Sequence, residues 1–343
     1  MKALVLEKKL QLSLRDIDLP KQVKPNSVKI KMHTVGICGS DVHYYTHGKI
    51  GPFVVNKPMV LGHEGSGTVI EIGNNVSNLK VGDRVCIEPG VPDINSKEYI
   101  KGFYNLDPKL TFWATPPDHG CLTPEVVFPS NFVFKLPENV SYAEGAMIEP
   151  LAVGLQAAEK AKIIPGETAL VMGCGPIGLV IALTALAGGC SKVFIADIVG
   201  KKLEMCKYYK NLIPIDLNKE NPAEIVKKNT NNWGANIIFE ASGATKAYDV
   251  IFDSICPAGK IVIVGNPMNP IPMDFATLLT KEIEIKTVFR YAHQYERAIN
   301  LLSSNKIDVK PMITDTVAFD DSIKAFERAA QNLPEDVKIQ IQL

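Results

Sequence analysis

The chain has 343 residues, 46% of them hydrophobic, and its 37 basic residues balance 37 acidic ones to a formal net charge of zero. This length predicts two domains with sizeable cores. The charge balance argues against nucleic acid or an anionic membrane as a partner, because both are bound through a basic surface.

The apolar segments are too short to span a membrane. The longest smooth one, LVIALTALAGG from Leu179, is well below the roughly 20 residues that a spanning helix needs. The first residues, MKALVLEKKL, become charged too early for a signal peptide. Seven cysteines without a C-x-x-C pair favour free thiols in a reducing compartment. We therefore expect a soluble cytoplasmic protein.

Residues 1 to about 140 contain short β-type runs. ALVLE, VKIKMH and GTVIEIG are separated by turn signals such as GNN and VGDRV. A long helical period is missing from this region. The pattern predicts an irregular, mostly antiparallel β domain.

Two short stretches of this region carry possible metal ligands. GICGSDVHYY contains Cys38, Asp41 and His43, and GHEGSG contains His63 and Glu64. Cysteine, histidine and carboxylate side chains are the usual ligands of zinc in proteins. Two other interpretations remain open from the residues alone: His63 as a core histidine and Asp41 as a turn or capping residue.

A helix is predicted to begin at Ser141. Ser141 and Glu144 have the spacing of a capping box, and apolar residues then recur with a helical period. Pro150 predicts a kink or break, which places Glu149 at a discontinuity in the helix.

Six near-continuous apolar runs follow and alternate with helical segments. They are TALVMG, KVFIAD, LIPIDL, ANIIFEAS, GKIVIVG and EIKTVFR. This alternation predicts an α/β fold with a doubly wound parallel sheet of six strands, covered by helices on both faces. The tail beyond about residue 291 mixes helix and strand and ends in VKIQIQL, which we expect to complete the first domain.

The first βα turn carries the pattern G-x-G-x-x-G as Gly173, Gly175 and Gly178, and the next strand ends at Asp197, 19 residues after Gly178. This context predicts a dinucleotide site with the pyrophosphate at a helix N-terminus and the ribose at the acid. Asp197 would repel a 2′-phosphate, so we expect NAD rather than NADP. The alternative is a glycine-rich turn that binds no nucleotide.

The motifs together resemble a known family. G-H-E-x-x-G-x-x-x-x-x-G-x-x-V, from Gly62 to Val76, is the zinc signature of the medium-chain dehydrogenases, and C-G-S-D-x-H-Y at Cys38 resembles their polyol branch. EPG at 88, GFYNL at 102, ATPPD at 114, IEPLAVG at 148 and VFRY at 288 follow in family order. The resemblance covers nearly the whole chain.

The resemblance implies a GroES-like catalytic domain over residues 1–148 and 288–343 and a Rossmann-type NAD-binding domain over 149–287. It also implies that Cys38, His63 and Glu64 bind one catalytic zinc, with water or substrate in the fourth position. Glu149 would contact or replace that water, and the proton would leave through Ser40, this water and Glu149. Asp41 would orient His63, while Ser40 would lie nearest the alcohol and His43 would relay its proton; for His43 a solvated loop position is the alternative.

Two further groups of residues follow from the resemblance. The cofactor residues it implies are Gly173, Gly175, Ile177, Gly178, Asp197, Lys202, Val264 and Phe289. The substrate residues it implies are Tyr44, Phe112, Thr115, Arg290 and Tyr291. Ordinary alternatives are a surface salt bridge for Arg290 and plain core packing for Phe112.

The implied activity is hydride transfer between a polyol and NAD in a homotetramer or homodimer. Sorbitol or L-iditol would give fructose or sorbose, and xylitol would give xylulose. A related zinc dehydrogenase of idonate, threonine or a vicinal diol is the first alternative, and a metal-free binding or structural protein is the second.

One departure from the family concerns the metal count. Many relatives have four clustered cysteines after EPG for a structural zinc, but the stretch from Val91 to Pro108 has none. We therefore expect one zinc per subunit and a lobe held by packing of residues such as Tyr99, Phe103 and Tyr104, within the chain or against a neighbouring subunit.

Overall fold

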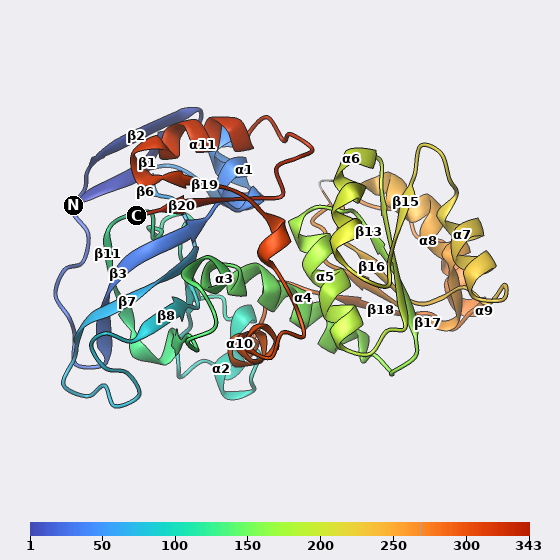
Figure 1. Ribbon diagram of the computed structural model, residues 1–343, viewed down its shortest axis with the longest axis horizontal. Helices are drawn as coiled ribbons and strands as arrows, with labels where there is room; N and C mark the ends of the chain where they lie inside the picture. Colours follow the sequence, from blue (N-terminus) through green and yellow to red (C-terminus); the bar gives the residue numbers. More distant parts are fainter. Residues whose placement is uncertain (268) are drawn as a thin grey trace. The chain divides into compact units, whose positions relative to one another are not determined.

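The computed structural model describes residues 1–267 and 269–343 of the chain. These residues form two compact units, shown in Figure 1. Unit 1 comprises Met1–Glu149 and Tyr295–Leu343, and unit 2 comprises Pro150–Gln294. Within the described residues, none of the helices is both long and apolar enough to cross a lipid bilayer.

Unit 1 is built on a sheet whose strand order is β12-β8-β7-β3-β20-β19, with β11 also on β3. All of its pairs are antiparallel except β19 with β20, which confirms the predicted irregular β domain. The strands of unit 1, in this sheet and in smaller ones, are β1 Lys2–Lys8, β2 Gln11–Asp16, β3 Ser27–Gly36, β4 Lys49–Ile50, β5 Phe53–Val54, β6 Met59–Val60, β7 Glu64–Ile72, β8 Arg84–Ile87, β9 Gly90–Val91, β10 Thr111–Phe112, β11 Glu125–Pro129, β12 Val133–Lys135, β19 Ile313–Ala318 and β20 Lys338–Gln342.

The core of unit 1 lies on the alternating apolar face of these strands. Leu4, Leu6, Ile30 and Met32 are completely inaccessible; β3 is buried mainly on alternate residues, whereas the middle of β1 is buried on both faces. The helices of unit 1 are α1 Gly39–His47, α2 Lys97–Ile100, α3 Tyr142–Ala146, α10 Tyr295–Ser303 and α11 Ser322–Ala329, and α4 Ile148–Ala161 begins there and continues into unit 2. The last strand, β20, pairs with the end of β3 across more than 300 residues of chain.

Unit 2 is a parallel sheet of six strands in the order β15-β14-β13-β16-β17-β18. All six predicted strands are confirmed: β13 Thr168–Met172, β14 Lys192–Asp197, β15 Leu212–Asp216, β16 Ala235–Glu240, β17 Ile255–Ile263 and β18 Glu284–Thr287. The helices are α5 Pro176–Ala187, α6 Gly200–Leu203, α7 Pro222–Asn229, α8 Tyr248–Ser254 and α9 Phe275–Thr280. In Figure 1, α5 and α6 lie on one face of this sheet and α7 and α8 on the other. The strand order reverses between β13 and β16, where ligands bind in doubly wound sheets.

The lobe after β8 contains hydrogen bonds around two buried side chains. Tyr104 donates from its hydroxyl to Glu88 Oε1 at 2.7 Å, and Asp107 accepts from the backbone of Asp93 and of Lys109 at 2.7 and 2.9 Å. The rings of Tyr99 and Tyr104 lie with centroids 6.2 Å apart, whereas Phe103 is 52% exposed, so its packing against a neighbouring subunit stays a prediction. Tyr104, its neighbour in the turn, takes the inward position, since its hydroxyl reaches the buried carboxyl.

The helix predicted from Ser141 is split at Met147 into α3 and α4. Pro150 lies in the first turn of α4, where a backbone N–H has no acceptor within the helix, so proline is tolerated. The predicted capping box is present: Glu144 N donates to Ser141 Oγ at 3.2 Å, and Ser141 N donates to Glu144 Oε2 at 2.9 Å. The break therefore precedes Glu149 by two residues.

Replacing Ser141 with alanine should lower the free energy of unfolding by about 1 kcal/mol, because α3 loses its N-cap acceptor. Chemical denaturation of unit 1, followed by circular dichroism, measures this loss. Ser141→Thr keeps a hydroxyl at the same position and is the control, with a smaller expected change. Equal destabilisation by both substitutions would contradict the capping role.

Candidate active site

Three possible metal ligands lie together in unit 1. One ligand atom from each of Cys38, His63 and Glu64 lies within 4.8 Å of the others. Strand pairing brings them together, because Gly36 at the end of β3 is the register partner of Glu64 at the start of β7. The chain then passes from Gly36 to Cys38, the N-cap residue of α1, two positions later. The predicted grouping of these three residues is therefore present in the folded chain.

The absence of a side chain at Gly36 makes room for Glu64. A Cβ built on Gly36 would overlap Glu64 Oε2 and also crowd the rest of that side chain. The glycine is needed here for close approach rather than for a special backbone angle. One side of the Glu64 carboxylate is thus fixed by the backbone of β3.

Asp41 is completely buried beside the three ligands. Its carboxylate accepts hydrogen bonds from Gly62 N at 3.1 Å and from Cys38 N at 3.3 Å, the second as part of the capping box of α1. Its Oδ2 also lies 3.3 Å from His63 Nδ1. Asp41 therefore has both functions that the sequence left open, a capping residue and a carboxylate that orients the histidine.

The electrostatics of this cluster favour a cation. Burial alone would lower the pKa of His63, but the charges of Asp41 and Cys38 outweigh it and raise that pKa well above the usual value. His63 Nδ1 has no hydrogen bond of good geometry despite its burial. A thiol, an imidazole and a carboxylate within 4.8 Å of one another form a donor set that suits zinc. The residues fit the implied metal.

A lysine that the sequence analysis missed contacts Glu64. Lys338 Nζ donates to Glu64 Oε1 at 2.7 Å and to Oε2 at 2.8 Å. Burial lowers the pKa of Lys338, but the charges of Glu64 and Cys38 raise it more, so the net shift is upward. The only signal in the sequence is the alternation in KIQIQ, which normally predicts a solvated polar face; here Lys338 and Gln340 are buried.

The residues around the cluster come mainly from α1. Ser40 Oγ donates to Cys38 Sγ at 3.3 Å. His43 stacks on His47 with ring centroids 4.2 Å apart, and burial together with the charge of His47 lowers its pKa. Tyr44 on the same helix is buried. Of the other predicted residues in unit 1, the ring of Phe112 lies 5.7 Å from that of His63, and Thr115 lies in the turn that follows.

Glu149 lies at the beginning of α4 and is buried. It is not one of the three residues whose ligand atoms lie within 4.8 Å of one another. Its charge acts on Lys338 and on Glu88. Burial raises the pKa of Glu88 to about 7, with the charge of Glu149 adding to the rise and the hydrogen bond from Tyr104 opposing it. Two carboxyl groups are therefore buried in this part of unit 1.

The glycine-rich turn of unit 2 has the geometry of a phosphate-binding loop. Gly173 has a φ of 103°, which only glycine adopts readily, and a Cβ on Gly178 would overlap Gly173 O. A Cβ on Gly175 would meet no atom within 4 Å, so the backbone there faces open space. Gly175 is the N-cap residue of α5, whose first N–H groups are free to bind an anion.

Asp197 ends β14 next to this turn. Its Oδ2 accepts from Cys174 N at 2.7 Å and its Oδ1 accepts from Val199 N at 2.8 Å. These two bonds hold the carboxylate at the carboxyl edge of the sheet and tie the middle of the glycine loop to it. The lone pairs that the two bonds leave free can accept from ribose hydroxyls.

The other predicted residues of unit 2 lie in helices and loops that follow its strands. Ile177 lies in the first turn of α5 and Lys202 in α6, while Val264 follows β17 and donates from its backbone to Glu240 O at 2.8 Å. Arg290 has a φ of 55°, and its guanidinium lies 5.0 Å from the centre of the Phe289 ring. Tyr291 is buried.

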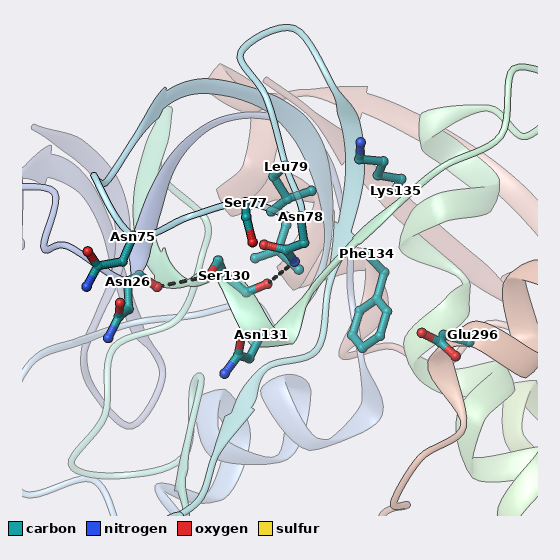
Figure 2. A pocket seen from close by; sticks show the side chains of 11 residues that line it. Asn26, Asn75, Ser77, Asn78, Leu79, Ser130, Asn131, Phe134, Lys135 and Glu296 are labelled. Carbon is teal, nitrogen blue, oxygen red and sulfur yellow. Dashed lines mark hydrogen bonds between the residues drawn. The ribbon is translucent and has the colours of Figure 1, made fainter.

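Two hollows on the surface of unit 1 differ in whether predicted site residues line them. One of about 380 Å³ is lined by Phe112, Asp118 and His119 among others. Figure 2 shows another, of about 660 Å³, lined mainly by asparagine and serine side chains, with Phe134, Lys135 and Glu296 to one side. Asn78 Nδ2 donates to Ser130 O at 3.2 Å within it. None of the residues predicted for the site lines this second hollow.

Comparison with known proteins gives two family matches. The alcohol dehydrogenase GroES-like domain matches residues 24–138, and the zinc-binding dehydrogenase family matches residues 176–304. The first segment includes Cys38, His63 and Glu64, and the second begins with helix α5 and includes Gly178 and Asp197.

Several relatives align over most of the chain. A putative D-xylulose reductase of Agrobacterium fabrum is 55% identical over 99% of both chains. The D-xylulose reductase of Morganella morganii is 51% identical over 96% of this chain and 98% of its own. Bovine (Bos taurus) sorbitol dehydrogenase is 42% identical over 92% of this chain and 89% of its own.

Solved structures show the same architecture. An Escherichia coli oxidoreductase of unknown specificity superimposes with a TM-score of 0.94 and 34% identity, covering 99% of this chain and 98% of the other. The 2R,3R-butanediol dehydrogenase of Bacillus subtilis superimposes with a TM-score of 0.91 and 29% identity, covering 100% and 99%. The predicted two-domain fold class is thereby confirmed.

Replacing Gly36 with alanine should weaken zinc binding by about tenfold or more, because the added methyl group displaces the Glu64 carboxylate. Competition with a chromogenic chelator measures the zinc Kd. Gly39→Ala is the matched control, because a Cβ there meets nothing within 4 Å and zinc binding should not change. The same Kd for Gly36→Ala and the unsubstituted protein would show that Glu64 does not contribute to the metal site.

Proposed function

The chain belongs to the zinc-binding alcohol dehydrogenase family, and from this premise we propose that it is an NAD-dependent polyol dehydrogenase that interconverts a sugar alcohol and a 2-ketose. It is an oxidoreductase that requires zinc and NAD. Xylitol with xylulose and sorbitol with fructose are the leading pairs, since relatives named D-xylulose reductase and sorbitol dehydrogenase align over nearly the whole chain. The observation that carries the proposal is the cluster of Cys38, His63 and Glu64.

We assign the catalytic zinc, one per subunit, to Cys38, His63 and Glu64. When bound, the metal acts as a Lewis acid that lowers the pKa of the substrate hydroxyl. Asp41 holds the ring of His63 in one orientation. Glu149 is assigned to the fourth position of the metal, either directly or through water, and its burial at the start of α4 supports a role inside the site.

We assign proton transfer to Ser40, His43 and Glu149. Ser40 Oγ already contacts Cys38 Sγ and takes the proton of the substrate hydroxyl. His43 lies three residues later on α1, on the same face of the helix, and passes the proton toward solvent. Its lowered pKa keeps the imidazole neutral near pH 7, which is the form that accepts a proton.

NAD is assigned to the glycine loop and its neighbours in unit 2. Gly173, Gly175 and Gly178 would receive the pyrophosphate and Asp197 the adenosine ribose, with contributions from Ile177, Lys202, Val264 and Phe289. The nicotinamide supplies the hydride chemistry itself. The residues 149–287 would form this NAD-binding domain, and residues 1–148 with 288–343 the catalytic domain.

The polyol is assigned to Tyr44, Phe112, Thr115, Arg290 and Tyr291. Polyols present many hydroxyl groups, so a specific site needs several hydrogen-bonding side chains together with shaped apolar walls. The proximity of Phe112 to His63 supports this assignment for one member of the group.

Cytoplasmic residence and assembly into a homotetramer or homodimer belong to the same proposal, and seven free cysteines are consistent with a reducing compartment.

A vicinal diol is the second candidate substrate. The structural likeness to 2R,3R-butanediol dehydrogenase favours it, although the identity of 29% is lower than that to the sugar-alcohol enzymes. Idonate and threonine remain further candidates within the same family. All of these substrates are secondary alcohols, so the same metal and hydride chemistry would apply to each.

Activity with a panel of substrates tests the function. The purified protein should reduce NAD with xylitol or sorbitol at a higher kcat/KM than with 2,3-butanediol, idonate or threonine. Cys38→Ser should lose both zinc and turnover, while Cys190→Ser, at a buried cysteine of unit 2, should keep both. A full rate without zinc would contradict the zinc mechanism, and a preference for butanediol would favour the second candidate.

Replacing Asp197 with asparagine should reduce the preference for NAD over NADP by about tenfold or more, because a charged hydrogen bond of about 1.5–3 kcal/mol is lost and the repulsion of a 2′-phosphate disappears. The ratio of kcat/KM for the two cofactors measures the effect. Asp216→Asn is the matched control, because Asp216 occupies the paired position on the adjacent strand β15. A wild-type preference for NADP would overturn the assignment.

A further inference from the structure

The ion pair between Lys338 and Glu64 is one of the most deeply buried in unit 1. The exposed fraction of the side chain is 3% for Lys338 and 1% for Glu64. The lysine ammonium bonds to both carboxylate oxygens and donates a third hydrogen bond to Ile37 O at 3.1 Å. All three ammonium hydrogens therefore have an acceptor, two of them on the carboxylate assigned to the metal.

The position of this lysine restricts what Glu64 can do. Gly36 closes one side of the carboxylate, and Lys338 occupies both of its oxygens. A metal held by Cys38 and His63 must share these oxygens with the ammonium group, because the carboxylate cannot turn away without losing a buried partner. A carboxylate that is also bonded to an ammonium group is a weaker metal ligand than one without this partner, since the nearby positive charge repels the metal.

We propose that Lys338 is a positioning residue that takes the place of the metal on Glu64 while the site is empty and competes with the metal once it is bound. Glu64 is then the weakly held ligand of the set, and Cys38 and His63 are the firm ones. This inference rests on the ligand set given under the proposed function. Its physical basis is that a buried carboxylate must always have a cationic or hydrogen-bonding partner.

A thermodynamic cycle gives the expected effect. Removal of Lys338 leaves Glu64 buried without a cation in the metal-free protein, whereas in the zinc-bound protein the metal still pairs with it. The metal-free form is therefore destabilised more than the zinc-bound form. By linkage, zinc must bind the variant more tightly than it binds the original protein.

The experiment compares Lys338→Met with Lys338→Arg in the full-length protein. Thermal unfolding is recorded with and without zinc, and the zinc Kd is measured by competition with a chelator. Lys338→Met should lower the Tm of the metal-free form more than that of the zinc-bound form and should decrease the zinc Kd by about tenfold or more. Lys338→Arg, which keeps the charge, should have a zinc Kd within about threefold of the original.

Lys260→Met is the matched control. Lys260 also bonds to both oxygens of one carboxylate, that of Glu167, and to one backbone oxygen, that of Lys162, but it lies in unit 2. This substitution should lower the Tm with and without zinc alike and leave the zinc Kd unchanged. An unchanged or increased zinc Kd in Lys338→Met would overturn the competition and leave Lys338 as an ordinary structural residue.

The double variant Glu64→Gln/Lys338→Met removes both buried charges together, so neither is left without a partner, and it is compared with Glu64→Gln alone. In the Glu64→Gln background, adding Lys338→Met should change the zinc Kd by less than about threefold, since no carboxylate charge is left to share. A tenfold decrease there would overturn the inference, because it would mean that Lys338 repels zinc without acting through Glu64. If Cys38→Ser leaves zinc binding intact, the ligand set itself is wrong, which is a separate failure of the proposed function.

Discussion

The pairing of β3 with β7 is the constraint on which the active site depends. Their register places Gly36 opposite Glu64, and the chain reaches Cys38 two residues beyond that point. A shift of the register by one residue would turn Glu64 to the other face of the sheet, because successive side chains alternate in direction. The glycine at position 36 then allows the carboxylate to lie against the backbone of β3. One ladder of backbone hydrogen bonds thus brings together Cys38 with His63 and Glu64, although Cys38 and Glu64 are 26 residues apart in the chain.

Burial of charge is the second theme of unit 1. Asp41, Glu64 and Lys338 are all essentially inaccessible, and each has partners that compensate for the loss of water. Asp41 has two backbone N–H groups and the imidazole of His63, and Glu64 has the ammonium of Lys338. Such groups are costly unless they are fully paired, so their joint presence in one small volume is a mark of function rather than of stability.

The dinucleotide loop of unit 2 depends on more local rules. Three glycines have three different tasks: a left-handed backbone at Gly173, an open approach at Gly175 and close packing at Gly178. Asp197 reaches the loop through a hydrogen bond to Cys174 N, so the acid at the end of one strand also fixes the turn after the neighbouring one. The loop and the acid are adjacent because parallel strands β13 and β14 end at the same edge of the sheet.

The sequence by itself determined the elements whose signal is local. The six strands of unit 2, the capping box at Ser141 and the glycine loop follow from periodicity, capping chemistry and turn geometry within a few residues, and the structure has all of them. The grouping of Cys38, His63 and Glu64 came from resemblance to a family, since spacing along the chain does not place residues in contact.

Only the tertiary structure decided the rest. Lys338 lies 274 residues from Glu64 and was missed, because a lysine in an alternating strand normally faces water. Here Lys338 bonds to Glu64 and Gln340 bonds to Ala143 O, so the polar face of β20 is buried. Phe103 and Tyr104 are adjacent in one turn, yet Tyr104 is buried with its hydroxyl bonded to Glu88 while Phe103 is exposed, and the sequence does not distinguish the two. Long-range pairing and the need to compensate buried charge are properties of the whole fold, and no segment of the sequence contains them.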